Sequence, residues 1–282
     1  MRGLIITADD FGTAVEVNEA VERAYRDGVL TAASLMVTGP AAADAVERAR
    51  RMPGLRVGLH LVLVEGRPVL PSESIPTLVA DDGAFRRNMV RAGLDMFFRP
   101  RARRELAMEV EAQFQAFAAT GLELDHANTH KHFHLHPTVA ESIVLSGRRY
   151  GLKAIRVPHE SPRTLRAIDR RTPWANSYAL APFCLTLRAR LKAAGFLVPD
   201  RVFGIAWSGS MTREKLRALV ERLPEGLNEV YLHPALRDEF PGAAPGYRYR
   251  QEFEALVDPG VIAAVRESGT KLGGFADFLS HR

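Results

Sequence analysis

The chain has 282 residues, of which 46% are hydrophobic and 25% are charged. These proportions are ordinary for a folded globular protein and exclude a disordered or fibrous class. The net charge is +5, but no nucleic-acid-binding motif accompanies the basic excess, so we expect no nucleic-acid partner. The single cysteine, Cys184, excludes an internal disulfide and a thiolate metal site.

The first predicted strand, residues 3–8, is a short apolar run that ends in two acids. It is too short for a signal peptide, and no stretch approaches the roughly 20 apolar residues of a membrane span. We therefore expect a cytoplasmic protein, with peripheral contact at the inner membrane face left open.

Hydrophobic spacing then predicts alternating helices and strands, with an irregular proline-containing segment at 64–100. The regular elements of this first half are a helix at 14–27, a strand at 32–37, a helix at 41–51, a strand at 56–62 and a helix at 102–120.

The second half continues the alternation around another proline-rich irregular stretch, 158–200, which contains an amphipathic helix at 183–195. Its other predicted elements are strands at 122–130, 154–157, 202–207 and 229–232, helices at 139–150, 212–223 and 260–268, and a last strand at 271–274. About seven such units predict a parallel (β/α) barrel of the TIM type, complete or slightly broken, as one domain over residues 1–282. There is no GxGxxG motif after the first strand, so a dinucleotide-binding fold has no support.

Asp9 and Asp10 are the first candidate site residues. Adjacent carboxylates at the end of a buried strand repel each other and lose solvation, so a purely structural role seldom needs both. The strand end can turn both toward one site, where one binds a cation and the other accepts a proton. The alternative is that Asp10 caps the following helix.

His60 lies in an apolar strand, in the sequence Val-Gly-Leu-His-Leu. A lone histidine in such a run is more often a hydrogen-bonded core residue than a ligand. Its position near a strand C-terminus favours the ligand, because barrel enzymes place their chemistry there.

Residues 125–136 hold five of the nine histidines. Neutral imidazole is the commonest protein metal ligand near neutral pH, so this density predicts a metal or catalytic site. If the chain is extended here, alternate residues point to one side. The histidines that would share this side are His130, His132, His134 and His136.

His233 ends another predicted strand and is followed by proline, which starts a turn. It is either a core histidine or a catalytic acid. The carboxyl ends of parallel strands meet at one mouth of a barrel, so His233 is expected beside the other candidates. One aspartate and two histidines around an ion leave positions open for water and substrate, a set suited to amide or ester hydrolysis.

Four ordered segments resemble the YdjC-like carbohydrate deacetylases, which include the chitooligosaccharide deacetylases. They are Thr-Ala-Asp-Asp-Phe-Gly at 7–12, Gly-Leu-His-Leu at 58–61, Asn-Thr-His-Lys-His-Phe-His at 128–134 and Leu-His-Pro-Ala at 232–235. The resemblance runs from residue 3 to about residue 275. It implies a (β/α) barrel that removes the acetyl group from an N-acetylated sugar.

The resemblance also implies roles for individual residues. Asp10, His60 and His130 would bind a divalent metal, zinc or magnesium. Asp9 would be the general base and His233 the general acid. The remaining candidates would bind substrate or support the metal ligands: Arg156, which could alternatively orient Asp9, Asn128, which replaces the family's usual aspartate, His126, His132 and His134.

Further segments are similar to the branch associated with hopanoid biosynthesis, usually called HpnK: Thr-His-Lys-His-Phe-His-Leu-His-Pro at 129–137, Arg-Val-Pro at 156–158 and Phe-Gly-Ile-Ala-Trp-Ser-Gly at 203–209. This similarity implies an N-acetylglucosaminyl hopanoid glycolipid as substrate. The stretches 94–101 and 183–196 mix aromatic and basic residues, which suits a membrane surface or an amphiphile. Packing on the barrel or a homodimer interface explains them equally well.

Two alternatives stay open at this point. One is a deacetylase or amidase with the same site that acts on chitooligosaccharides or another N-acetyl sugar. The other is a catalytically silent protein that binds a sugar or lipid. Intact Asp9 argues against the silent protein, because binding alone does not need a base beside a metal ligand.

Overall fold

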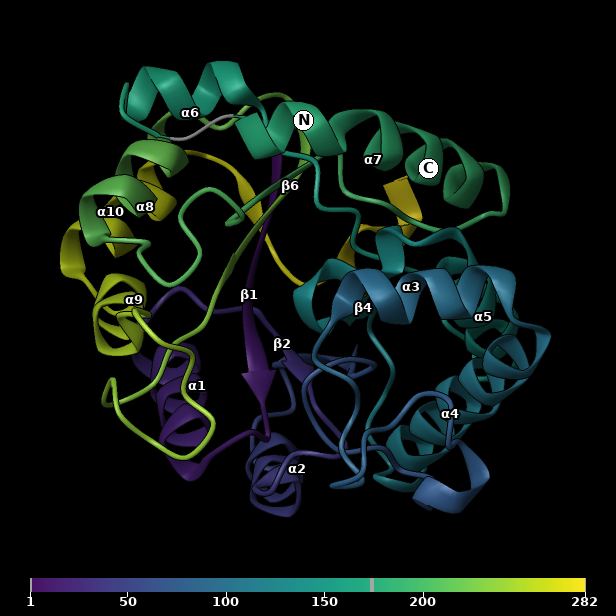
Figure 1. The fold of residues 1–282 in the computed structure, drawn as a ribbon. Helices are drawn as coiled ribbons and strands as arrows, with labels where there is room; N and C mark the ends of the chain where they lie inside the picture. Colours follow the sequence, from purple (N-terminus) through teal and green to yellow (C-terminus); the bar gives the residue numbers. More distant parts are fainter. Residues whose placement is uncertain (1, 173–174, 282) are drawn as a thin grey trace.

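The computed structural model describes residues 2–172 and 175–281 and consists of strands surrounded by helices (Figure 1). Seven parallel strands form the sheet, in the order β4-β3-β2-β1-β6-β5, with β7 added beside the start of β1. The strands are β1 (Arg2–Phe11), β2 (Ala32–Leu35), β3 (Arg56–Leu61), β4 (Ala127–Thr129), β5 (Arg201–Phe203), β6 (Gly226–Leu232) and β7 (Lys271–Leu272).

The helices lie around the outside of the strands, as a (β/α) barrel requires (Figure 1). They are α1 (Val15–Asp27), α2 (Ala42–Arg50), α3 (Met89–Phe98), α4 (Pro100–Ala119), α5 (Pro137–Arg149), α6 (Pro162–Ile168), α7 (Ala175–Ala193), α8 (Arg213–Glu221), α9 (Tyr249–Leu256) and α10 (Pro259–Glu267). Short 3₁₀ turns are η1 (Ser72–Ser74), η2 (His130–Leu135) and η3 (Ala276–His281). Within the described residues, no helix is both long and apolar enough to cross a membrane.

An irregular segment, residues 153–159, closes the barrel between β4 and β5. On one side, the backbone N–H of Ala127 donates to Ala154 at 3.1 Å. On the other side, Ile155 donates to Leu197 at 3.0 Å and Val202 donates to His159 at 3.0 Å. The predicted barrel is confirmed, but in place of the strand expected at 154–157 there are only two isolated bridges, made by Ala154 and Ile155.

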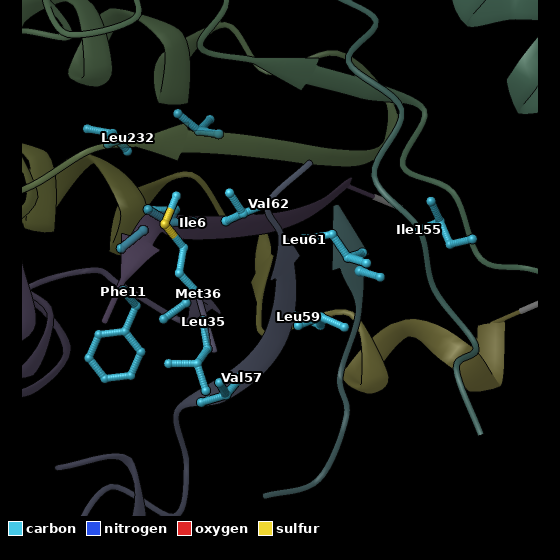
Figure 2. Close-up of a cluster of buried hydrophobic side chains, with 14 of the residues drawn as sticks. Ile6, Phe11, Leu35, Met36, Val57, Leu59, Leu61, Val62, Ile155 and Leu232 are labelled. Atoms are coloured by element: carbon cyan, nitrogen blue, oxygen red, sulfur yellow. The ribbon is translucent and has the colours of Figure 1, made fainter. Parts of the chain in front are cut away.

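Side chains alternate along β1 between the helices and the barrel interior. Leu4, Ile6 and Ala8 belong to the large apolar cluster shared with the helices. Figure 2 shows part of this cluster, including Ile6 of β1 and neighbours from β2, β3 and β6. Ile5 belongs to a smaller cluster, in which Phe275 and Phe278 cover the other end of the interior. Successive residues of a strand point to opposite faces, so Thr7 and Asp9 continue the inward row above Ile5.

Several predicted boundaries were wrong. Segments 64–100 and 158–200 are not wholly irregular, because α3 and α6 form there and α7 begins before residue 183. The helix α9 was not predicted; it is short and follows an irregular stretch, 233–248. The strand expected at 122–130 is reduced to three residues, Ala127–Thr129.

Candidate active site

The four candidate motifs meet at the carboxyl ends of the strands. Asp9 and Asp10 lie near the end of β1, His60 is the penultimate residue of β3, and His130 directly follows β4. His233 directly follows β6. The expected convergence at one mouth of the barrel is therefore confirmed, because parallel strands end on the same side.

A local distortion of β1 turns Asp10 into the mouth. The pairing register with β2 shifts between Ala8 and Phe11, and Asp10 has a φ of 62°. This left-handed conformation is uncommon outside glycine, although aspartate tolerates it better than most residues. On a regular strand Asp10 would point away from Asp9, so the bulge is what brings both carboxylates to one site.

Asp10, His60 and His130 form a compact group of potential ligands. Asp10 Oδ1 lies 3.4 Å from His60 Nε2 and 3.4 Å from His130 Nδ1. The three ligand atoms all lie within 4.8 Å of one another. Asp10 Oδ1 is buried and has no hydrogen bond that satisfies ordinary geometry. A buried carboxylate oxygen in this position is suited to a cation.

Asn128 holds the other side of the His60 ring. Its Oδ1 lies 2.5 Å from His60 Nδ1, and its Nδ2 lies 2.9 Å from Ser34 Oγ. Turning the amide around would place its nitrogen against His60 and its oxygen against Arg156. The two orientations correspond to two tautomers of His60, and a metal at Nε2 requires the one with the oxygen toward Nδ1–H.

Asp9 is paired with Arg156 in the barrel interior. Arg156 Nη1 lies 2.5 Å from Asp9 Oδ2, and Nη2 lies 2.9 Å from Oδ1. The same guanidinium donates from Nε to Glu229 Oε1 at 2.9 Å, and Thr7 donates to that oxygen at 2.9 Å. Arg156 is fully buried. The geometry therefore favours the orientation of Asp9 over the binding of sugar.

Charge partners keep both aspartates ionised. Burial alone would raise the pKa of Asp9, but the guanidinium of Arg156 outweighs it and holds that pKa below its usual range. Burial also opposes ionisation of Asp10, but the nearby imidazoles of His130 and His60 lower its pKa well below the usual value. So strongly acidic a carboxylate is a weak base, and Asp9 can accept a proton readily only from an acidified water.

His233 lies beside the Asp10, His60 and His130 group and contacts the carboxylate of Glu252. Its backbone N–H donates to Glu252 Oε2 at 2.6 Å, and its Nδ1 lies 3.8 Å from the same oxygen. Burial raises the pKa of Glu252, although His233 opposes this shift. His233 also interacts electrostatically with Asp9 and Asp10. Its place next to both carboxylates is compatible with an acid role.

The expectation that the histidine-rich segment is extended was wrong. Residues His130–Leu135 form the 3₁₀ turn η2, in which Lys131 and His132 have φ values of 54°. The alternation that would aim four histidines to one side does not exist in a turn. Only His130 reaches Asp10 as a close neighbour.

The other candidate histidines surround the site without joining the ligand group. His132 Nε2 lies 2.8 Å from the hydroxyl of Tyr231, and His134 Nδ1 lies 2.8 Å from Thr129 Oγ1. Burial lowers the pKa of His134 to about 3, so this imidazole is neutral. His126 is fully buried and contacts Ser34 at 3.0 Å, which links it to Asn128.

Gly58 makes room for the His126 ring. A Cβ at position 58 would lie 2.5 Å from His126 Cε1 and Nδ1, both ring atoms. Ser34 contacts Nε2 of His126. The other ring nitrogen, Nδ1, lies 2.9 Å from Oδ2 of Asp125. Asp125 also accepts the backbone N–H of Ala276 at 2.8 Å. His126 therefore connects the site to the C-terminal end of the chain.

Sequence reasoning missed several residues of the site. Glu229 and Tyr231 precede His233 at intervals of two on β6 and point to the same side, so strand alternation could have identified them. Tyr231 lies against the guanidinium of Arg156, with 4.5 Å from Cζ to the ring centre. Tyr247 lies in an irregular loop, where no periodic signal exists. Its ring stands 5.3 Å from that of His233, and its hydroxyl lies 2.8 Å from Ser208 Oγ.

Residues 3–267 match the family described as YdjC-like protein. A carbohydrate deacetylase from Geobacillus stearothermophilus is 30% identical over 98% of each chain. A chitooligosaccharide deacetylase from Klebsiella pneumoniae is also 30% identical, over 98% of this chain and 99% of its own.

A solved structure has the same fold along almost the whole chain. It is a protein from Enterococcus faecalis assigned to cellobiose-phosphate cleavage, with a TM-score of 0.74, 26% identity and 98% coverage of both chains. A lactam utilization protein from Thermus thermophilus, 17% identical with a TM-score of 0.50, covers 97% of this chain and all of its own. At that identity it supports the fold alone.

Proposed function

Because the chain belongs to the YdjC-like family, we propose that it is a metal-dependent carbohydrate deacetylase and that residues 1–282 form one catalytic domain. The deacetylase activity named for the Geobacillus and Klebsiella relatives supports the reaction. The observation that carries the metal dependence is the group formed by Asp10, His60 and His130.

The distances from Asp10 to the two imidazoles suit a divalent cation. Bonds of about 2.0–2.1 Å to a tetrahedral ion place neighbouring ligand atoms about 3.3 Å apart. Asp10 Oδ1 lies 3.4 Å from each imidazole nitrogen. Two imidazoles and one carboxylate favour zinc over magnesium, because magnesium prefers oxygen ligands. Such an ion would polarise the acetyl carbonyl and acidify the attacking water.

The chain's own residues would move the protons. We assign Asp9 as the base that takes the proton of the attacking water, since Arg156 fixes its position and keeps it ionised. His233 would protonate the amine that leaves as acetate forms, and Glu252 lies 3.8 Å from its Nδ1. Asn128 would keep His60 in the tautomer that presents Nε2.

The substrate we propose is an N-acetylated sugar, and more narrowly the N-acetylglucosaminyl group of a hopanoid glycolipid. The narrower assignment is supported by the segments at 129–137, 156–158 and 203–209, which resemble the hopanoid-associated branch. The chitooligosaccharide deacetylase among the relatives supports a soluble N-acetyl sugar as the other substrate. A glycolipid substrate would also bring the enzyme to the inner membrane face.

Acetate release tests both levels of this proposal. We would assay metal-stripped protein, and protein restored with zinc or magnesium, on an N-acetylglucosaminyl hopanoid and on N,N′-diacetylchitobiose. Metal-dependent release from the lipid alone is the expected result. Release from chitobiose alone would retain the deacetylase and reject the lipid. No release from either substrate would overturn the deacetylase.

The variant Asp9→Asn separates an enzyme from a silent binding protein. It removes the base and leaves the ligands Asp10, His60 and His130 in place. We expect turnover to fall while substrate binding, measured by calorimetry, is retained. A wild-type protein that binds sugar with metal present and never releases acetate would be a binding protein instead.

A further inference from the structure

Helix α3 exposes an unusual number of large apolar side chains. Val90 is 74% exposed, Phe98 71%, Leu94 54% and Phe97 40%. Four such residues on one ten-residue helix form a patch of the kind that marks an interaction surface. Phe183 of α7, 62% exposed, lies across a groove from Phe97. We call α3 and Phe183 together the α3 face.

Arginines surround this face. Residues 86–104 contain seven arginines and one acid, Asp95. Asp95 is already bound by two of them, since Arg86 lies at 2.9 Å and Arg99 at 3.0 Å. Four exposed arginines have no acidic partner among the described residues: Arg87, Arg91, Arg103 and Arg104. Arg103 donates to the backbone carbonyls of Met96 and Phe97, so Arg87, Arg91 and Arg104 are the free ones.

Two grooves border the α3 face. One, of about 760 Å³, runs between α5 and α7 and is lined by Phe97, Phe183 and Arg190. The other, of about 380 Å³, lies under α3 and is lined by Phe133 and His136. Phe133 and His136 belong to the same short segment as His130. The apolar surface therefore continues directly from the segment that carries a proposed metal ligand.

We propose that the α3 face docks the protein on an anionic phospholipid bilayer. Exposed aromatic and aliphatic side chains enter the boundary between headgroups and acyl chains, and the surrounding arginines bind the lipid phosphates. A second copy of the chain is a poor occupant, because two faces that each carry unpaired arginines repel each other.

This inference stands apart from the proposed reaction, because vesicle binding needs no turnover. Exposed residues of the α3 face touch neither Asp10 nor His60. Acetate release from a soluble sugar should therefore be unchanged in variants of the face. A failure of deacetylation and a failure of membrane docking are thus observed in different assays.

Vesicle co-sedimentation is the test. Wild-type protein is expected to sediment with vesicles of phosphatidylcholine and phosphatidylglycerol, and weakly with phosphatidylcholine alone. The triple variant Arg87→Gln/Arg91→Gln/Arg104→Gln should bind anionic vesicles about a hundredfold more weakly. The variant Val90→Glu/Phe98→Glu should lose binding, because it removes the apolar anchors and adds negative charge.

Matched variants on other surfaces control for net charge and for lost apolar area. Arg213→Gln/Arg217→Gln/Arg222→Gln removes the same charge from α8 and the residue that follows it. Val15→Glu alters an exposed apolar residue of α1. Both should bind as the wild type does, with unchanged thermal unfolding in all variants. Equal binding by the α3 and α8 variants, or no binding by the wild type, would overturn the proposal. So would a dimer in sedimentation equilibrium that the α3 variants dissociate.

Discussion

Two adjacent carboxylates, Asp9 and Asp10, belong to regions that are built in opposite ways. Below the mouth, Asp9 is matched by the bidentate guanidinium of Arg156, which also binds Glu229. At the mouth, Asp10 faces two imidazoles and leaves Oδ1 without a hydrogen-bond donor. The charge of Asp9 is matched by another side chain of the protein, whereas Asp10 Oδ1 is left in a position suited to a cation.

The comparison of Asp9 with Asp10 separates residues that matter for stability from residues that matter for function. A buried charge with a partner depends on that partner, so its removal destabilises the fold. Asp10 lies beside two other candidate metal ligands and has no guanidinium partner, so its neutralisation should cost activity more than stability. Backbone geometry supports the same division, because Asp10 is held at a φ of 62°.

Asp10→Asn should have the largest effect on activity. Asparagine tolerates the left-handed backbone, so the fold is retained while the anionic ligand is lost. We expect kcat/KM to fall on the order of 10³-fold, together with the bound metal. Metal content by mass spectrometry and acetate release measure the change. Full metal occupancy in the variant would contradict the proposed ligand group.

Arg156→Met should have the largest effect on stability. It leaves Asp9 and Glu229 buried without their cation, which costs about 3–5 kcal/mol of unfolding free energy. Arg56→Met is a matched control, because Arg56 also binds an aspartate with two nitrogens but is one-third exposed. It should cost less than about 1 kcal/mol. Urea unfolding of both variants, without metal, makes the measurement. Equal losses would remove the distinction between the two pairs.

Acid titration of metal-free protein sharpens the account of Asp9. Its folded pKa lies below its usual value of 3.8, so the folded state binds fewer protons than the unfolded state. The resulting stabilisation is present above the usual pKa and is lost as pH falls below it. The variant Asp9→Asn has no charge at this position and therefore lacks this pH-dependent stabilisation. The difference in unfolding free energy between wild type and variant should therefore shrink between about pH 6 and pH 2. A constant difference would show that the charge of Asp9 is not stabilising.

Tyr247→Phe should have the smallest effect. Phenylalanine keeps the ring that stands against His233 and loses the hydroxyl that contacts Ser208. We expect a fall in kcat/KM of roughly two- to tenfold without loss of stability. Gly209→Ala is the stronger comparison, since Gly209 has a φ of 70° and any Cβ there would clash with the Tyr247 ring. A Gly209→Ala variant with wild-type kinetics would show that the ring position does not matter.

Much of the fold and the choice of site residues could be predicted from the sequence. Apolar runs gave the central strands, and helical spacing gave most of the outer helices, because both patterns are local. Asp9, Asp10, His60 and His233 could be placed together, since parallel strands end on one side of a barrel. Helix α3 was missed because its apolar residues face outward, so its spacing differs from that of a helix packed on a core.

By itself, the sequence determined which strand ends carry the candidate site residues. What only the tertiary structure decided was how these residues pair. Arg156 reaches Asp9 across 147 positions of the chain, and a bulge turns Asp10 beside His60. Local patterns set the direction of a side chain within its own strand. The partner that satisfies its charge comes from another strand, and only the closed barrel brings the two together.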